Sequence, residues 1–240
     1  MDNNNNSNSN KLLKNELKID FNASLFKSKL GNKDYWDELY RKEKNQFCNN
    51  IQLGGEIWFG QQVQDKVINY INKLYSNNFD VKIIDIGCGN SEFLFALQKQ
   101  NYNNLTGIDY SKESIEFVIE KCKKLFAKDN LFELYEIDLN SKNINNYLKE
   151  KKFNLIHDKG TFDAFMLLES NNYINYVNYI KELADKDNLM IITSCNFNKE
   201  ELLYYFKNSI ELIDEISYKK FSFGGSSGQT VTTLVFKIIK

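Results

Sequence analysis

The stretch Val81-Lys82-Ile83-Ile84-Asp85-Ile86-Gly87-Cys88-Gly89-Asn90 joins a short apolar run to a glycine-rich turn. Residues 81–86 have the length and the β-branched content of a buried strand, and the apolar residues at 93, 94 and 97 have helical spacing. Gly87 and Gly89 lack a Cβ, so a ligand can approach the backbone and the start of the following helix. The stretch therefore predicts a strand, a ligand-binding turn and a helix.

Strands and helices alternate from this unit towards the C-terminus. Further apolar runs occupy 105–108, 132–137, 153–157 and 189–193, and helical periodicity is found through 115–122, 141–150 and 173–184. This alternation predicts a mainly parallel sheet covered on both faces. Residues 210–218 and 231–239 are strand-like with no room for a crossover helix between them, so they should pair antiparallel. We expect an α/β, Rossmann-like fold with seven strands, mostly parallel, and a C-terminal antiparallel hairpin.

The chain divides into three regions by composition. Residues 1–25 are low-complexity and rich in Asn and Lys, which predicts a disordered tail. Residues 26–80 predict an N-terminal helical cap over the ligand site, with a helix around 34–40, a glycine-flanked aromatic loop at 54–60 and a second helix through 63–74. Residues 81–240 form the expected core.

The overall charge and composition argue against several classes of protein. The 240 residues contain 31 Lys and Arg against 32 Asp and Glu, so no net field attracts nucleic acid or an anionic membrane. The four cysteines have no CxxC spacing, which disfavours a metal site or a disulfide framework. No signal peptide or membrane span is recognisable. We expect a cytoplasmic monomer, with nuclear entry open to a chain of this size.

The turn favours one cofactor class over another. A dinucleotide site would follow the pattern GxGxxG, but Glu92 occupies the third glycine position, and its bulk and charge oppose a pyrophosphate. A ligand with positively charged amino and sulfonium groups is compatible with Asp85 and Glu92, which indicates S-adenosylmethionine. Asp109 ends the second strand, where it can accept both ribose hydroxyls. A helix cap before Ser111 is the alternative role for Asp109.

Other residues are expected around the same cofactor. Asp138 ends the third strand and could face the adenine amino group with Leu139 beside the ring, although Asp138 could equally cap a helix. The predicted cofactor-binding residues are Trp36, Asp85, Gly87, Gly89, Asp109, Tyr110, Asp138, Leu139 and Asp158.

Residues 158–163 follow the fourth strand and should lie at the same sheet edge, close to the transferred methyl group. Asp158 is the candidate catalytic residue of this segment, in a position for contacts with the acceptor. The single histidine, His157, lies within an apolar run and is interpreted as a core residue, so hydrolase chemistry lacks its base. Because the chain has no proline, it cannot carry the Asn/Asp-Pro-Pro-aromatic motif of enzymes that methylate bases.

Six segments together resemble the methyltransferase-like 10 family. They are GEIWFG (55–60), DIGCGN (85–90), TGIDYS (106–111), DKGTFDA (158–164), ITSCN (192–196) and KFSFGG (220–225). The resemblance covers about residues 31–239. It implies a class I methyltransferase fold, S-adenosylmethionine as cofactor, and methylation of a lysine of a protein partner, translation elongation factor 1-alpha.

A lysine acceptor must lose its proton before it reacts, since its ordinary pKa is ~10.4. Desolvation in an aromatic channel would favour this loss. With a lysine as the implied acceptor, we expect Asp158 to orient the amine or to accept its proton through water. We expect the wall of such a channel to be built by Trp58, Phe59, Phe162 and Phe223, with a plain core role as the alternative for some of them. Two other functions remain open: a small-molecule methyltransferase, and a cofactor-binding interaction module without catalysis.

Overall fold

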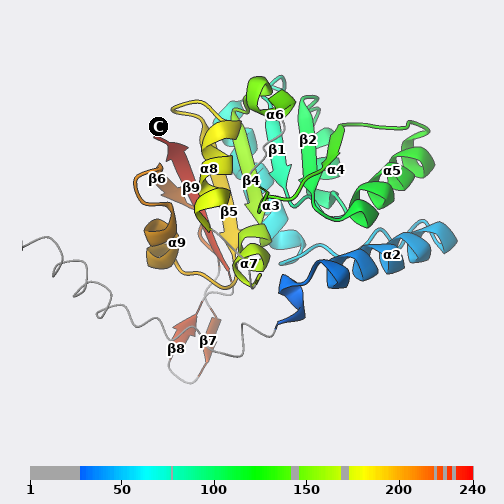
Figure 1. Ribbon diagram of the computed structural model, residues 1–240, viewed down its shortest axis with the longest axis horizontal. Coiled ribbons are helices and arrows are strands. Elements are labelled where there is room, and N and C mark those ends of the chain that lie inside the picture. The colour runs from blue at the N-terminus through cyan, green and yellow to red at the C-terminus, as the bar shows by residue number, and fades with distance from the viewer. Residues whose placement is uncertain are drawn as a thin grey trace, which may run out of the picture.

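A seven-stranded sheet forms the centre of the protein (Figure 1). The structure, a computed structural model, describes residues 28–76, 78–141, 146–168, 173–218, 221–223, 226–228 and 231–239, and the predicted tail at 1–25 lies outside them. The strand order is β3-β2-β1-β4-β5-β9-β6. The strands are β1 (Ile83–Ile86), β2 (Leu105–Asp109), β3 (Glu133–Glu136), β4 (Leu155–Lys159), β5 (Leu189–Ser194), β6 (Ile210–Glu215) and β9 (Thr232–Ile238).

The pairing of these strands confirms the predicted fold class. The five strands β1 to β5 pair parallel, whereas β9 pairs antiparallel with both β5 and β6. All seven observed strands overlap the predicted apolar runs. The last strand of the chain therefore lies inside the sheet, between β5 and β6, and β6 forms the edge.

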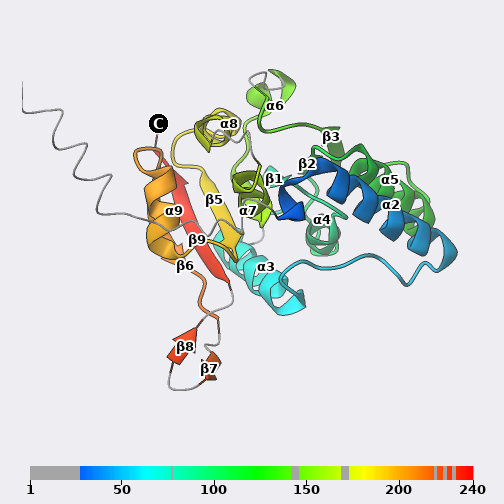
Figure 2. The ribbon, with the colours of Figure 1, turned by 60° about the horizontal axis from the view of Figure 1, so that its bottom comes forward.

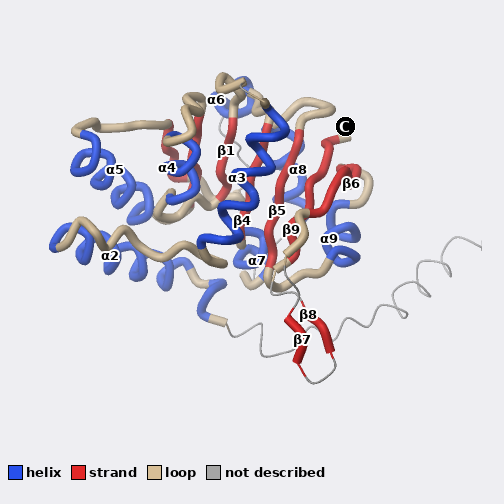
Figure 3. Tube along the Cα trace, turned by 180° about the vertical axis from the view of Figure 1, so that it is seen from behind, coloured by secondary structure: helices blue, strands red, loops and turns tan. Residues whose placement is uncertain are grey.

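Helices cover both faces of the sheet. One face packs against α3 (Gln61–Tyr75), α4 (Glu92–Gln98) and α5 (Lys112–Phe126), which lie in front in Figure 3. The other face packs against α6 (Asn146–Lys151), α7 (Thr161–Met166), α8 (Tyr173–Leu183) and α9 (Lys199–Phe206), which lie in front in Figure 1. None of the described helices is long and apolar enough to cross a membrane.

The two faces draw on alternate residues of each strand. In β4, Leu155 packs in the cluster on the α3 and α4 side, and Ile156 packs in the cluster on the α8 side. Such alternation follows from the period of two along a strand. It decides which residues at the strand ends can face a common site.

Helix α2 (Lys33–Asn49) lies outside these layers, along α5 (Figure 2). Lys44 of α2 pairs with Glu113 and Glu116 of α5, and the rings of Phe47 and Phe117 are 5.8 Å apart. A separate hairpin of β7 (Phe221–Phe223) and β8 (Ser226–Gly228) projects beyond the sheet on the same edge as α7 (Figure 1).

Two helices were not expected from the periodicity. The short helix α7 begins directly after β4, and its N-cap is Gly160, whose φ of +80° is unfavourable for other residues. The N-cap of helix α9 is Asn198, whose side chain forms a reciprocal capping box with that of Glu201. Helix α3 belongs to the same apolar cluster as β1, while α2 does not. The division into a cap and a core stays a prediction.

Candidate active site

A cavity of about 160 Å³ lies at the carboxyl edge of the parallel strands. It is bounded by the turn after β1, the ends of β2 and β4, helix α2 and the loop before α3. The predicted residues that line it are Trp36, Trp58, Phe59, Asp85, Gly87, Gly89, Asp109, Tyr110, Asp138 and Leu139. Every residue predicted to bind the cofactor is among them except Asp158.

The glycines of the turn are required by close neighbours. Gly87 and Gly89 have φ angles of +64° and +52°. A Cβ on Gly89 would lie 2.7 Å from the hydroxyl oxygen of Tyr40, and a Cβ on Gly87 would lie 2.1 Å from Oγ1 of Thr161. Helices α2 and α7 therefore close onto the turn from two sides, and any side chain there would displace one of them.

Asp109 is bound to the glycine turn through its carboxylate. One oxygen accepts a hydrogen bond from the amide of Gly89 at 2.9 Å, and the other accepts one from the amide of Ser111 at 2.8 Å. Burial raises the pKa of Asp109 to about 6. Ser111, rather than Asp109, occupies the cap position of α5. A carboxylate has about four lone-pair sites, so Asp109 retains acceptors for two ribose hydroxyls.

Asp85 is hydrogen-bonded to His157 on the neighbouring strand. The two residues are register partners in β1 and β4, and Nδ1 of His157 lies 2.7 Å from a carboxylate oxygen of Asp85. The imidazole stacks on Phe93 at 3.7 Å between centroids and is fully buried. His157 is therefore a buried residue, as expected, but it also orients a carboxylate of the site, and only the strand register could have indicated this.

A buried cluster of charged side chains packs against the end of the glycine turn at Asn90 and Glu92. Lys121 of α5 donates hydrogen bonds to the carbonyl oxygens of Gly54 and Asn90, at 3.0 Å each, and to the carboxylate of Glu92. Glu43 of α2 accepts hydrogen bonds from the amide of Glu56 and the side chain of Asn90. The cluster joins α2, α5 and the loop before α3 to the cofactor turn, and it directs the negative charge of Glu92 towards Lys121.

Asp158 does not line the cavity, so the structure does not bring it together with the other predicted cofactor residues, and its predicted contact with the cofactor and the acceptor stays a prediction. Its carboxylate accepts hydrogen bonds from the amides of Thr161 and Phe162 and from the hydroxyl of Tyr176 in α8. Burial raises the pKa of Asp158 to about 8. The physical reason is the alternation along β4: Asp158 points to the α8 face, and Lys159 points to the cavity.

Phe162 is likewise a core residue. It is completely buried and packs against Tyr176, Phe197 and Phe206, with ring centroids 5.0 to 5.4 Å apart. It does not line the cavity, which agrees with the core role given above as its alternative, and a part in the acceptor channel stays a prediction. Phe223 lies in β7, but its side chain is outside the described part of the structure, so its predicted role stays a prediction.

Two charged residues of the same segment reach the cavity instead. Asp163, in the first turn of α7, accepts hydrogen bonds from the hydroxyl of Ser194 and, at 2.8 Å, from the amide of Cys195. Burial raises the pKa of Asp163. Lys159, at the end of β4, donates to the carbonyl oxygen of Trp58 at 3.2 Å. Asp163 was not predicted from the sequence because the helix that follows Gly160 was not expected, and this helix turns Asp163 back towards the end of β4.

Aromatic rings form the outer wall of the cavity. Trp36 stacks on Tyr40 at 6.0 Å and lies 5.2 Å from Trp58, and its indole nitrogen donates to the carbonyl oxygen of Leu30 at 2.7 Å. The ring of Phe59 lies against Gly160, where a Cβ would come within 2.9 Å of it. Within the described residues, no group of three His, Cys, Asp or Glu side chains is arranged to hold a metal ion.

The residues of the cavity fit S-adenosylmethionine. Asp85 and Asp109 offer carboxylates for an amino group and ribose hydroxyls, and the backbone at Gly87 and Gly89 is open to close approach. Residues 77–234 match the family described as "Methyltransferase domain". Fold, site and this match define a class I methyltransferase that uses S-adenosylmethionine. The contacts of individual residues with the cofactor stay predictions.

Curated relatives narrow the class to a family. The chain is 37% identical over 213 residues to the EEF1A lysine methyltransferase 2 of Danio rerio, covering 88% of each chain. It is 32% identical over 226 residues to the protein-lysine N-methyltransferase EFM4 of Saccharomyces cerevisiae, covering 89% of this chain and 96% of the relative. The chain belongs to the family of these protein-lysine methyltransferases, which confirms the relationship indicated by its motifs.

Solved structures share the fold. A TehB-like S-adenosylmethionine-dependent methyltransferase from Corynebacterium glutamicum superposes with a TM-score of 0.57 at 19% identity, over 83% of this chain and 98% of that one. The magnesium protoporphyrin IX methyltransferase of Synechocystis with bound cofactor gives a TM-score of 0.53 at 14% identity, over 76% of this chain and 85% of that one. Such low identities support the shared architecture only.

Proposed function

We propose that this protein transfers methyl groups from S-adenosylmethionine to a lysine of translation elongation factor 1-alpha. Two curated relatives named EEF1A lysine methyltransferase 2 share most of their length with this chain. The observation that carries the proposal is that Trp58 and Phe59 line the same cavity as Asp85 and Asp109. The aromatic loop can thus receive an acceptor beside a bound cofactor, which supplies the electrophilic methyl group.

The residues at the acceptor side have distinct tasks. Trp58 and Phe59 exclude water from an entering lysine side chain, and desolvation lowers the pKa of its ammonium group. Asp163 replaces Asp158 as the group that orients the amine or takes its proton through water, because it lines the cavity and its donors hold it in place. Its raised pKa makes Asp163 a better proton acceptor than an exposed aspartate.

Purified elongation factor 1-alpha and a methyl-labelled cofactor test the substrate. We expect label on the factor, located at a lysine by mass spectrometry. Trp58→Ala should lower kcat/KM at least about tenfold, since aligned positioning accounts for larger factors. Tyr204→Ala, which removes an exposed aromatic ring on α9 outside the cavity, is the matched control and should leave kcat/KM unchanged.

The same labelling in a cell lysate separates the other two functions. Label in small molecules would identify a small-molecule methyltransferase, and no label at all would identify a binding module without catalysis. Either result contradicts the proposed protein substrate.

Asp163→Asn tests the proposed proton acceptor against its neighbour Asp158. We expect Asp163→Asn to lower kcat and to displace the pH profile of kcat, while the affinity for S-adenosylhomocysteine is retained. Asp158→Asn should leave the pH profile of kcat in place, because Asp158 faces α8. Equal pH profiles in wild type and Asp163→Asn would contradict the assignment.

We also propose that the protein acts as a monomer in the cytoplasm, with access to the nucleus, and binds neither nucleic acid nor membranes directly. The near balance of 31 basic and 32 acidic residues supports this, because it gives no field for phosphate surfaces. Sedimentation of the purified protein and localisation of a tagged copy test the two parts. A stable dimer, or exclusion from the cytoplasm, would contradict them.

A further inference from the structure

Lys159 is the basic residue among the described residues that line the cavity. It stands two positions beyond His157 on the same side of β4, so its side chain extends towards the carboxylate of Asp85 on the adjacent strand. Its ammonium group donates to the carbonyl oxygen of Trp58 at 3.2 Å. In the described part of the chain, no carboxylate lies within ion-pair distance of it.

An ammonium group in this position lacks a close counter-ion. Burial lowers the pKa of Lys159, while the charges of Asp85 and Glu92 act in the opposite direction. Asp85 is already bonded to His157, and Glu92 is paired with Lys121. A buried charge is normally paired, and an ammonium group can donate three hydrogen bonds, so Lys159 has donors left for a ligand.

The other charged residues that line the cavity are acidic. They are Glu56, Asp85, Glu92, Asp109, Asp138 and Asp163. Their field attracts the amino and sulfonium groups of the cofactor and repels the α-carboxylate of its methionine part. With Lys159 on β4 beside Asp85 on β1, the amino group of the methionine part would face a carboxylate, and its carboxylate would face an ammonium group.

We propose that Lys159 binds the α-carboxylate of S-adenosylmethionine and so selects cofactors that carry this group. Asp85 then faces the amino group from β1, and Lys159 faces the carboxylate from β4. The hydrogen bond from Lys159 to Trp58 links the occupied cofactor site to the aromatic loop of the acceptor side. This inference rests on the cofactor assigned above and is independent of the acceptor.

Calorimetric titration with S-adenosylmethionine and with its decarboxylated analogue tests the assignment without an acceptor. The two ligands differ only in the carboxylate. We expect the wild-type protein to bind S-adenosylmethionine about 10- to 100-fold more tightly, the range of a charge-assisted hydrogen bond. Lys159→Met should reduce this preference to about threefold or less by weakening S-adenosylmethionine alone, and Lys159→Arg should retain most of it.

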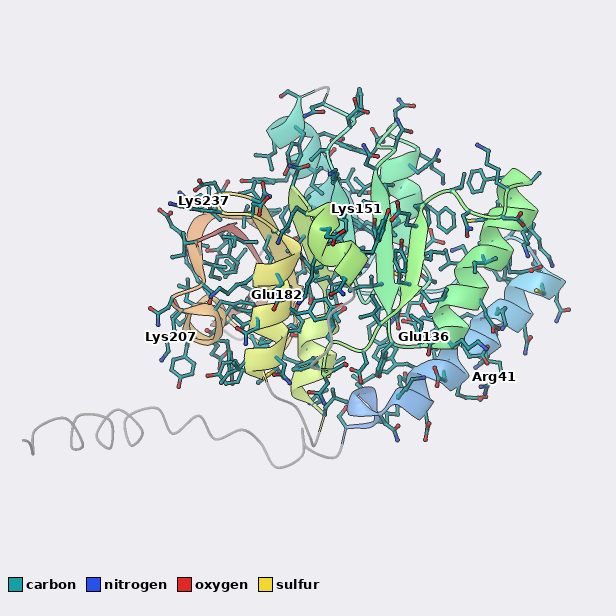
Figure 4. The ribbon with its side chains drawn as sticks, turned by 45° about the horizontal axis from the view of Figure 1, so that its top comes forward. Arg41, Glu136, Lys151, Glu182, Lys207 and Lys237 are labelled. Atoms are coloured by element: carbon teal, nitrogen blue, oxygen red, sulfur yellow. The ribbon has the colours of Figure 1, made fainter. Side chains whose placement is uncertain are left out.

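Lys237→Met is the matched control, because Lys237 does not line the cavity and pairs with Glu211 instead. Figure 4 shows Lys237 at the opposite end of the molecule from Arg41 of α2, the helix that borders the cavity. Lys237→Met should leave the preference unchanged. A wild-type preference retained in Lys159→Met, or equal weakening of both ligands, would overturn the assignment to Lys159 alone. A wild-type protein that binds neither ligand would overturn it together with the cofactor. Failure to methylate elongation factor 1-alpha would leave these titrations unaffected.

Discussion

Replacing Lys121 by methionine should lower the free energy of unfolding by about 3 kcal/mol. Only 1% of the Lys121 side chain is exposed, and its ammonium group binds Glu92 and the carbonyl oxygens of Gly54 and Asn90. Methionine keeps most of the apolar stem against Phe95 and Phe117 but removes all three hydrogen bonds. The expected loss of stability therefore comes from the broken hydrogen bonds and ion pair, and not from lost packing in the core.

The magnitude depends on what Lys121→Met leaves behind. Removing one partner of a buried ion pair typically destabilises a protein by about 3–5 kcal/mol. We take the lower limit because 26% of the Glu92 side chain is exposed, so water can solvate its charge after the substitution. For a chain of 240 residues this corresponds to a melting temperature lower by about 6–12 °C.

Chemical and thermal denaturation of four proteins measure the effect: wild type, Lys121→Met, Glu92→Gln and the double variant. The sum of the losses in unfolding free energy of the two single variants should exceed the loss of the double variant by about 1–3 kcal/mol, since the partners interact directly. Lys124→Met on the same helix is the control, because 35% of the Lys124 side chain and 34% of the side chain of its partner Glu120 are exposed. It should lower the free energy of unfolding by less than about 1 kcal/mol. A Lys121→Met effect no larger than that of Lys124→Met, or strictly additive single effects, would refute the reasoning.

Three further outcomes are expected. Burial raises the pKa of Asp158 to about 8, above its ~3.9 in an unfolded chain. Ionisation of Asp158 therefore opposes folding, and stability should fall as the pH rises between these values. Asp158→Asn should flatten the pH dependence of the melting temperature between about pH 5 and 8, and an unchanged slope would contradict this. Phe162→Ala should lower the unfolding free energy by about 3–5 kcal/mol in denaturant titrations, and a loss under about 1 kcal/mol would contradict its core position. Gly89→Ala should weaken the binding of S-adenosylhomocysteine about tenfold in calorimetry, because the new Cβ clashes with Tyr40 and the backbone at this position is left-handed. Adding Tyr40→Phe to this variant should recover part of the affinity, and no recovery would refute the clash.

The cofactor side of the site was predictable because its signals are local. A buried strand followed by glycines, and an acidic residue at the end of the next strand, place Asp85, Gly87, Gly89 and Asp109 by rules that hold for parallel sheets in general. Strand ends of a parallel sheet meet at one edge whatever the details of packing. The predicted positions of these residues at the cavity agree with the structure for that reason.

The acceptor side was harder to predict because neighbours in sequence point in opposite directions. Asp158 and Lys159 are adjacent, yet one binds Tyr176 under α8 and the other faces the cavity. The period of two along a strand indicates that the two side chains point to opposite faces of the sheet. Only the packing of the helices shows which face carries the site. The pairing of Lys121 with Glu92 likewise depends on how α5 meets the turn. Such contacts arise from tertiary structure.

The position of β9 has a consequence for the synthesis of the protein. Residues 232–238 follow every other strand along the chain, yet they separate β5 from β6 in the sheet. While the nascent chain grows, β5 has an open hydrogen-bonding edge and β6 has no partner, and such edges invite pairing with other chains. Premature termination ahead of β9 should therefore yield an aggregating product, even though every residue that lines the cavity has already been translated.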